Sequence, residues 1–299
     1  GAAVGHAFSL NMAAMEQNIP MILTVHSFLQ DNEFKGIKVG LLKNLHWKKI
    51  ISVGSNLAES LFNEGIEAED LTIIPPPVDT DKFKHGLSKK WLRSRVGVGE
   101  NEKLILHASR LDSTGVAESK GVFTLLKAFA SLKSKDTKLL LACAPTIPSL
   151  QARKDETVAK IMDTAKLLGI EGKVIIETFD PEDMHHVYSG ADLYVMASQM
   201  ESFGLVYAEA LACGIPVIGT SVGGVPEVIE DGKTGELVEP DNHVLLAKTI
   251  KKMMKNKTRM KKMGIEGRQN IEEKLHLDKT AKALIGICES VIKKNKKDD

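Results

Sequence analysis

The sequence has few aromatic residues, few cysteines, almost no net charge and no long apolar run. Aromatic residues make up 5% of the 299 residues, which argues against a surface that stacks nucleobases. The 40 Lys and Arg residues nearly cancel the 39 Asp and Glu residues, so no nucleic-acid partner is expected. Cys143, Cys213 and Cys288 are far apart and odd in number, which favours buried thiols in a reducing, cytoplasmic compartment. No apolar run reaches the ~18 residues of a membrane span.

The chain does contain many apolar, β-branched runs of strand length separated by helical patterns. The length allows about two domains. The predicted strands are Met21–His26, Lys49–Val53, Leu71–Ile74, Lys103–Ser109, Lys138–Ala144, Lys173–Phe179, Asp192–Ala197, Pro216–Thr220 and Gly235–Val238. The predicted helices are Val122–Lys133, Ser149–Leu168, Pro181–Ser189, Leu205–Cys213, His243–Lys255, Arg259–Leu275 and Asp278–Lys294. Apolar strands that alternate with helices predict an α/β fold with doubly wound parallel sheets covered on both faces.

The polar stretch Gly97–Lys103 is the expected boundary between domains. Residues 1–98 show three strands, too few for a doubly wound domain, whereas six strand–helix steps follow in residues 99–275. Residues 276–299 form a last helix, in which Ala281, Leu284, Ile285, Cys288, Val291 and Ile292 recur at helical spacing. Such an apolar stripe is expected to be buried.

Glu201 and Ser202 lie in a short loop after the strand that ends at Ala197, and a helix is expected to start near Phe203. Gly204 allows a ligand to approach the backbone, and the free N–H groups of a helix start bind anions. Glu209 lies ~9 Å along the helix in apolar surroundings, where sugar or ribose hydroxyls would satisfy its carboxylate. Alternatively, Ser202 caps the helix and both glutamates only favour its N-terminal half. The residues alone leave both interpretations open.

The spacing E-x7-E from Glu201 to Glu209, with the A-x-A-x-G-x-P-V-I that follows, resembles the retaining group-one glycosyltransferases of GT-B fold. The resemblance extends to Ala191–Ser198, Gly223–Ile229 and Asp231–Val238. It implies two Rossmann-like domains that face a cleft, with the donor site in the second domain and the last helix crossing back to the first.

Leu106–Leu111 followed by Lys120-Gly121 resembles the stretch of that family that binds the donor diphosphate. The resemblance implies that Arg110 and Lys120 neutralise the charge that grows as the sugar leaves. The loop Asp112–Ser119 is longer than is usual in the family, so Arg110 is the better supported of the two. The alternative is a pair of surface cations at a strand end.

Leu23–Ser27 resembles the first-domain strand of the family that ends in T-x-H, which implies that His26 contacts the transferred sugar. A histidine at a strand end can also have a purely structural role. Asp79-Thr80-Asp81 is interpreted as a turn, and adjacent helical residues such as His185 and His186 point about 100° apart. No metal site is therefore predicted.

The resemblance implies metal-independent transfer of a sugar, with retention, from a nucleoside diphosphate sugar to an acceptor hydroxyl. His26, Arg110, Lys120 and Glu201 would be catalytic. The donor would be held by Ser202, Phe203, Gly204, Leu205 and Glu209, without a cofactor, and UDP-sugars are favoured as the commonest donors. The acceptor is not specified by the sequence.

The family opens with a strand and a Gly-Gly loop that do not occur here, so roughly 80 residues of the first domain are expected to be missing. A non-catalytic sugar-nucleotide-binding module that assembles with a partner is therefore an alternative to the enzyme. An epimerase of the same fold is disfavoured by the E-x7-E spacing. Association of two copies through the first domain and peripheral contact at the inner membrane face are further expectations.

Overall fold

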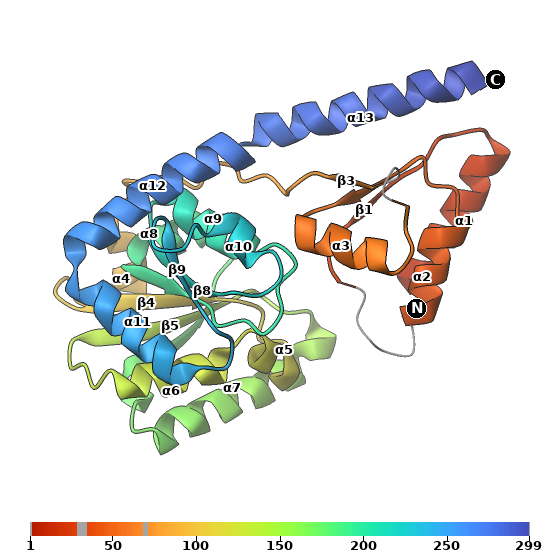
Figure 1. Ribbon diagram of the computed structural model, residues 1–299. Helices are drawn as coiled ribbons and strands as arrows, with labels where there is room; N and C mark the ends of the chain where they lie inside the picture. Colours follow the sequence, from red (N-terminus) through yellow and green to blue (C-terminus); the bar gives the residue numbers. More distant parts are fainter. Residues whose placement is uncertain (1, 29–34, 68–70, 299) are drawn as a thin grey trace. The chain divides into compact units, whose positions relative to one another are not determined.

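The computed structural model describes residues 2–28, 35–67 and 71–298 (Figure 1). The chain divides into two compact units, each with a parallel sheet of its own. The first unit joins Gly1–Pro77 to Leu275–Asp299, and the second is Val78–Lys274.

The first unit holds a three-stranded parallel sheet with the strand order β1-β2-β3. Its elements are α1 (Ala2–Glu16), β1 (Ile22–Val25), α2 (Lys35–Asn44), β2 (Lys49–Ser52), α3 (Ser55–Asn63), β3 (Leu71–Ile73) and α13 (Leu277–Asp298). The central strand β2 is the most buried, with Ile50 and Ile51 each 2% exposed. Helix α3 buries Leu57 and Leu61, which lie one turn apart on one face.

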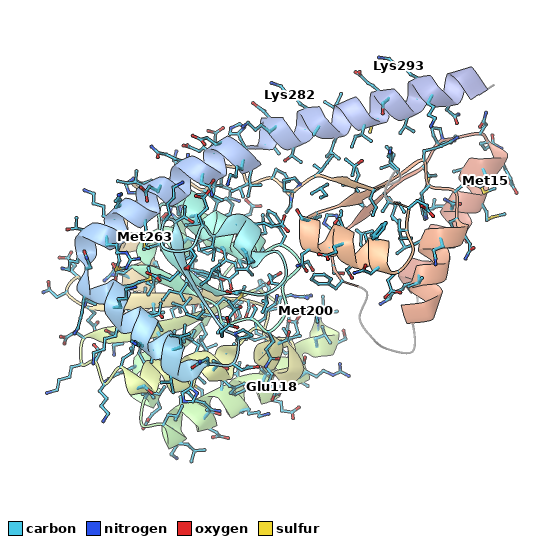
Figure 2. The ribbon with its side chains drawn as sticks, in the orientation of Figure 1. Met15, Glu118, Met200, Met263, Lys282 and Lys293 are labelled. Atoms are coloured by element: carbon cyan, nitrogen blue, oxygen red, sulfur yellow. The ribbon has the colours of Figure 1, made fainter. Side chains whose placement is uncertain are left out.

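Helix α13 is tied to the first unit along one narrow line. The Thr280 hydroxyl donates to the Pro75 carbonyl at 3.3 Å, and the Asn295 amide donates to the Asn18 carbonyl at 3.1 Å. Val291 is buried, but Ile285 and Ile292 are 57% and 49% exposed. The expectation that the whole apolar stripe is buried is therefore wrong, because only the Thr280–Val291 line faces inward. Lys282 and Lys293 project from the same helix (Figure 2).

The second unit holds a six-stranded sheet with the order β6-β5-β4-β7-β8-β9, parallel throughout. Its strands are β4 (Lys103–Ala108), β5 (Thr137–Cys143), β6 (Val174–Thr178), β7 (Leu193–Val195), β8 (Val217–Thr220) and β9 (Gly235–Val238). Its helices are α4 (Lys90–Arg95), α5 (Thr114–Ser119), α6 (Val122–Ser131), α7 (Gln151–Leu167), α8 (Met184–Gly190), α9 (Leu205–Ala212), α10 (Val225–Val228), α11 (His243–Lys255) and α12 (Lys257–Leu275). Single 3-10 turns span Pro148–Leu150, Glu171–Lys173 and Pro181–Asp183.

Helices cover both faces of this sheet (Figure 1). Ile105, Leu139 and Leu193 of the strands pack in one core with α6, α7 and α11. On the other face, the ring of Tyr194 in β7 meets the rings of Tyr188 in α8 and Tyr207 in α9 at 5.7 and 5.5 Å between centroids. Alternation along each strand thus sends apolar side chains into two cores, as a parallel sheet between helical layers requires.

The nine predicted strands and the predicted helices are confirmed, and so is their parallel arrangement. The sequence patterns missed α1, α2, α3, α4, α5 and α10. Residues Asp112–Ser119, expected to be a loop, contain α5, whose first turn is capped by the Ser113 hydroxyl accepting from the Val116 N–H at 3.3 Å.

Residues 78–98, assigned to the first domain from the sequence, lie in the second compact unit. Helix α4 is held there by buried Arg93, whose guanidinium donates to the Gly190 carbonyl at 3.2 Å and to the Asp192 carboxylate at 2.7 Å. The predicted domain boundaries stay predictions.

Candidate functional site

The strand order places β4 beside β7, and the chain winds away from this pair in opposite directions, to β5 and β6 on one side and to β8 and β9 on the other. Ligands of open parallel sheets bind outside the carboxyl ends of the strands at such a point. Arg110 follows β4 and Glu201 follows β7, so two of the predicted catalytic residues come from the loops at this position.

Lys120 and Glu201, 81 positions apart in the sequence, are brought together where the carboxyl ends of the strands lie, at the carboxyl edge of the sheet. The Lys120 ammonium donates to a Glu201 carboxylate oxygen at 2.7 Å. Both side chains are largely buried, with 29% and 14% exposed, so this ion pair is better shielded from water than a surface pair. The Gln199 N–H donates to the Ser119 carbonyl at 2.8 Å, which joins the end of α5 to the same loop.

Gly121 makes this approach possible. Its φ is +70°, and a Cβ added there would lie 1.9 Å from the Ala197 carbonyl oxygen. A side chain at this position would therefore push Lys120 and the β7 loop apart.

The loop from Glu201 to Gly204 is held by the turn at Gly223-Gly224. The Gly224 N–H donates to the Glu201 carbonyl at 3.0 Å, and a Cβ on Gly224 would lie 2.4 Å from the Ser202 carbonyl oxygen. Helix α9 begins at Leu205 after Gly204, which has φ +96°, and no side chain caps it. The alternative in which Ser202 caps this helix is therefore wrong, and among the described residues no side chain accepts from its first N–H groups. Met200, which directly precedes this loop, is 53% exposed (Figure 2).

Arg110 is largely exposed to solvent. Its side chain is 74% exposed, and its Nε lies 3.9 Å from an Asp112 carboxylate oxygen. The strand that leads to it is anchored by buried His107, whose Nε2 is 2.7 Å from the Ser109 hydroxyl and whose Nδ1 is 3.2 Å from the Val195 carbonyl. Burial lowers the pKa of His107 to about 4, so the ring is neutral. Its two hydrogen bonds hold the end of β4 in place next to the site.

Glu209 has a partner that the sequence patterns did not indicate. The hydroxyl of Tyr188 in α8 donates to its Oε2 at 2.8 Å. Burial raises the pKa of Glu209 to about 7, although the Tyr188 hydrogen bond and the charge of Lys82 act in the opposite direction. The sequence signal for this hydrogen bond was the tyrosine in the predicted helix Pro181–Ser189, because a buried tyrosine needs a partner for its hydroxyl.

His26 directly follows β1 in the first unit, and its side chain is exposed. Arg110, Lys120, Glu201 and Glu209 all belong to the second unit. The role of His26 at the transferred sugar therefore stays a prediction from the resemblance.

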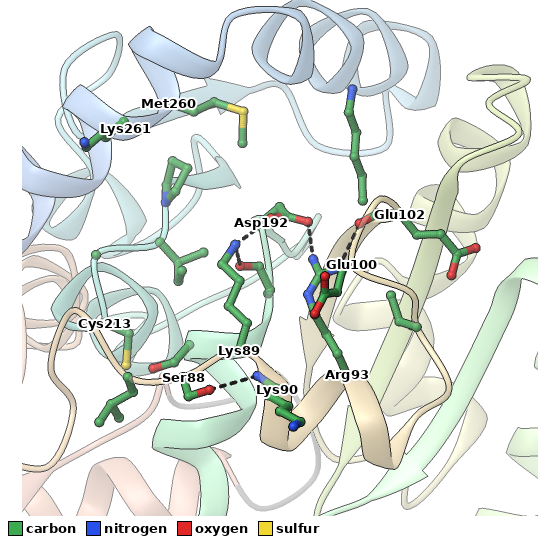
Figure 3. Close-up of a pocket in the computed structure, with 18 of the residues that line it drawn as sticks. Ser88, Lys89, Lys90, Arg93, Glu100, Glu102, Asp192, Cys213, Met260 and Lys261 are labelled. Carbon is green, nitrogen blue, oxygen red and sulfur yellow. Dashed lines mark hydrogen bonds and ion pairs between the residues drawn. The ribbon is translucent and has the colours of Figure 1, made fainter.

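A cavity of about 950 Å³ lies on the opposite side of the six-stranded sheet, at the amino-terminal ends of its strands, which form its amino edge. It is lined by residues at the starts of β4, β7 and β8, among them Lys103, Asp192 and Pro216. Figure 3 shows Lys89 and Arg93 converging on Asp192. The Lys89 ammonium lies 2.6 Å and the Arg93 guanidinium 2.7 Å from an oxygen of the Asp192 carboxylate. The Leu104 N–H also donates to this carboxylate at 2.8 Å, so these charges join α4 to the sheet.

In the described part of the chain, no group of three or more His, Cys, Asp and Glu side chains is arranged to hold a metal ion. None of the helices within residues 2–28, 35–67 and 71–298 combines the length and apolarity that a membrane crossing needs.

Comparison with known proteins finds similar chains among glycosyltransferases. A curated relative, N-acetyl-alpha-D-glucosaminyl L-malate synthase of Bacillus anthracis, is 27% identical over 87% of this chain and 70% of its own length. D-inositol 3-phosphate glycosyltransferase of Mycobacterium sp. (strain KMS) is 36% identical, over 60% of this chain and 40% of its own.

The crystal structure of Anabaena HepE in complex with UDP and glucose superposes with a TM-score of 0.85. It shares 21% identity with this chain and matches 96% of this chain and 76% of its own. Sucrose-phosphate synthase from Thermosynechococcus elongatus reaches a TM-score of 0.80 over 94% of this chain and 71% of its own, at 22% identity. The fold is thus the GT-B fold of glycosyltransferases. The family described as glycosyl transferases group 1 matches residues 88–270, more than half of the sequence, and the chain belongs to this family of sugar-transferring enzymes.

Proposed function

We propose that this protein transfers a sugar from a UDP-sugar to an acceptor hydroxyl, with retention at the anomeric carbon and without a metal ion. The observation that carries the proposal is the Lys120–Glu201 ion pair of 2.7 Å at the carboxyl edge of β4 and β7. It joins a cation for the donor diphosphate to a carboxylate for the donor sugar at the place where open parallel sheets bind ligands.

Charge stabilisation is the main contribution of the second unit. As the bond between the anomeric carbon and the diphosphate oxygen breaks, negative charge grows on the leaving group. Arg110, Lys120 and the free N–H groups at the start of α9 offset this charge, and groups fixed in advance do so without reorganisation. Arg110 suits bidentate phosphate contact because its guanidinium is planar and largely exposed.

The remaining roles follow the family resemblance. Glu201 and His26 contact the transferred sugar, and Glu209 accepts hydrogen bonds from the ribose. The acceptor oxygen attacks the face from which the diphosphate departs, a new C–O bond forms, and the acceptor proton passes to the leaving phosphate oxygen. UDP as the nucleotide is supported by the UDP and UDP-glucose complexes of the similar HepE structures.

Calorimetric titration with UDP, GDP and ADP, followed by an assay for consumption of UDP-glucose, tests the proposal. We expect UDP to bind most tightly and UDP-glucose to be consumed by transfer or slow hydrolysis. Binding of UDP without any turnover would instead support a non-catalytic sugar-nucleotide-binding module. Absence of binding for all three nucleotides would contradict both functions.

A further inference from the structure

The hydroxyl of Tyr188 meets the carboxylate of Glu209 from a different element of the second unit. Tyr188 lies in α8 and Glu209 in α9, and the hydroxyl donates to Oε2 at 2.8 Å. We infer that Tyr188 is a positioning residue for the donor nucleotide, whose hydroxyl holds the Glu209 carboxylate in place and in its charged form for the ribose. This inference rests on the proposed function, in which Glu209 binds the ribose.

The ring of Tyr188 is fixed before any ligand binds. It is fully buried, and the rings of Phe83 and Tyr194 lie 6.0 and 5.7 Å from it, each inclined by 60°. Edge-to-face packing against these two rings leaves the Tyr188 ring little freedom, so the position of its hydroxyl is fixed. A carboxylate attached to a flexible side chain gains a defined orientation from such a donor.

The geometry leaves acceptor capacity for a ligand. A carboxylate offers about four lone-pair positions, and the Tyr188 hydroxyl occupies one of them. Within the described residues, the structure shows no second hydrogen bond to the Glu209 carboxylate. The second oxygen, Oε1, can therefore accept from a ribose hydroxyl while Oε2 stays bound to Tyr188.

The surroundings of Glu209 make its charge sensitive to this one hydrogen bond. Burial raises its pKa to about 7, and the Tyr188 hydrogen bond is the strongest influence in the opposite direction, ahead of the charge of Lys82. The titratable groups that interact with the Glu209 carboxylate are Tyr188 in α8, Tyr194 in β7, Lys82 in the segment before α4, and Cys213 directly after α9.

Lys82 is the basic member of this set, and its charge lowers the pKa of Glu209. Burial raises the pKa values of Tyr188 and Tyr194 well above the usual range and that of Cys213 to about 12, which keeps all three neutral. Without the Tyr188 hydroxyl, the ionised form of Glu209 loses a donor while the neutral form loses less. Its pKa then rises further, and at neutral pH a smaller fraction of the protein can offer a carboxylate to the ribose.

Tyr188→Phe tests this inference because it retains the ring and its packing. The measurement is the affinity of the full chain for UDP by calorimetry between pH 6 and pH 9. At pH 7 we expect affinity to fall by about tenfold, as for loss of a hydrogen bond to a charged group. The pH at which half of the maximal affinity is lost should rise by about one unit, so that the deficit narrows toward pH 9.

Tyr194→Phe is the matched control, since its buried hydroxyl donates to the Ala108 carbonyl at 3.2 Å and not to Glu209. It should lower thermal stability and leave the pH midpoint for UDP binding unchanged. If wild type binds UDP and Tyr188→Phe matches it at every pH, or loses the same factor at every pH, the inference is overturned while the proposed function stands. A wild-type chain that binds no UDP contradicts the proposed function, and the inference falls with it.

Discussion

The two edges of the six-stranded sheet both carry ion pairs, but they use them differently. At the amino edge, the Asp192 carboxylate accepts from Lys89, Arg93 and the Leu104 N–H, all within 2.8 Å. At the carboxyl edge, Arg110 is 74% exposed beside one carboxylate at 3.9 Å. Lys120 there donates to the Glu201 carboxylate at 2.7 Å.

The difference agrees with the proposed donor site at the carboxyl edge of the sheet. Charges that already have several partners stabilise the fold and gain little from a further anion. Charges with few partners are the ones that a diphosphate can recruit. The large cavity at the amino edge and the proposed donor site at the carboxyl edge are therefore different places, and four changes can test this separation.

The largest effect is expected at the amino edge, for Arg93→Met. This variant leaves the Asp192 carboxylate and the carbonyls of Gly190, Gly99 and Glu102 without their buried donor. The free energy of unfolding should fall by about 3–5 kcal/mol, as for one partner removed from a buried pair. Denaturant titration measures this loss. The UDP affinity of the folded fraction should be unchanged, and a loss of affinity would show that the two edges are coupled.

Lys120→Met should produce the converse result. The rate of sugar transfer should fall by on the order of 10²–10³-fold, because the departing diphosphate loses a preorganised cation. Steady-state kinetics with UDP-glucose measures kcat/KM, and Lys89→Met is the matched control at the amino edge. Equal losses of kcat/KM in both variants would remove the distinction between the edges.

Glu209→Gln should show the cost in stability of a carboxylate kept for a ligand. In the folded protein its pKa is raised to about 7, so wild type gains protonation-linked stability below the ordinary pKa of 4.5 and loses it as pH rises through 7. Glutamine does not titrate. The free energy of unfolding of Glu209→Gln relative to wild type should thus increase by about 2 kcal/mol from pH 5 to pH 8. This value follows from ~1.4 kcal/mol per pKa unit, reduced because the carboxylate keeps some contact with solvent. Denaturant titrations at the two pH values measure it, and a constant difference would contradict the raised pKa.

The smallest effect is expected for Lys90→Ala at the rim of the amino-edge cavity. Lys90 is exposed, so the free energy of unfolding should change by less than about 0.5 kcal/mol, and UDP affinity should not change. Calorimetry at low ionic strength is the sensitive measurement, because surface charge effects are largest there. A marked loss of UDP affinity would identify the amino edge as a second place where the nucleotide binds.

The strands were predictable because each is a short apolar run, which is the sequence pattern of parallel strands buried on both faces. The helices that escaped detection lack such a signal. Helix α5 has only six residues and includes Gly115, and α1 is apolar without a clear stripe. The stripe of α13 shows the limit of amphipathicity as evidence, since a periodic pattern indicates a helix but not which of its residues find a partner.

The sequence by itself determined the succession of the strands along the chain, the family motifs around Glu201 and Glu209, and the role of Gly204 in allowing close backbone approach. Only the tertiary structure decided that Lys120 pairs with Glu201 and that Tyr188 holds Glu209, because these partners lie 81 and 21 positions apart. Local periodicity carries no information about pairing across the sheet, which follows from the strand order and from which loops it brings to one edge. The same reason explains why the charges of the amino edge, although equally visible in the sequence, serve the fold.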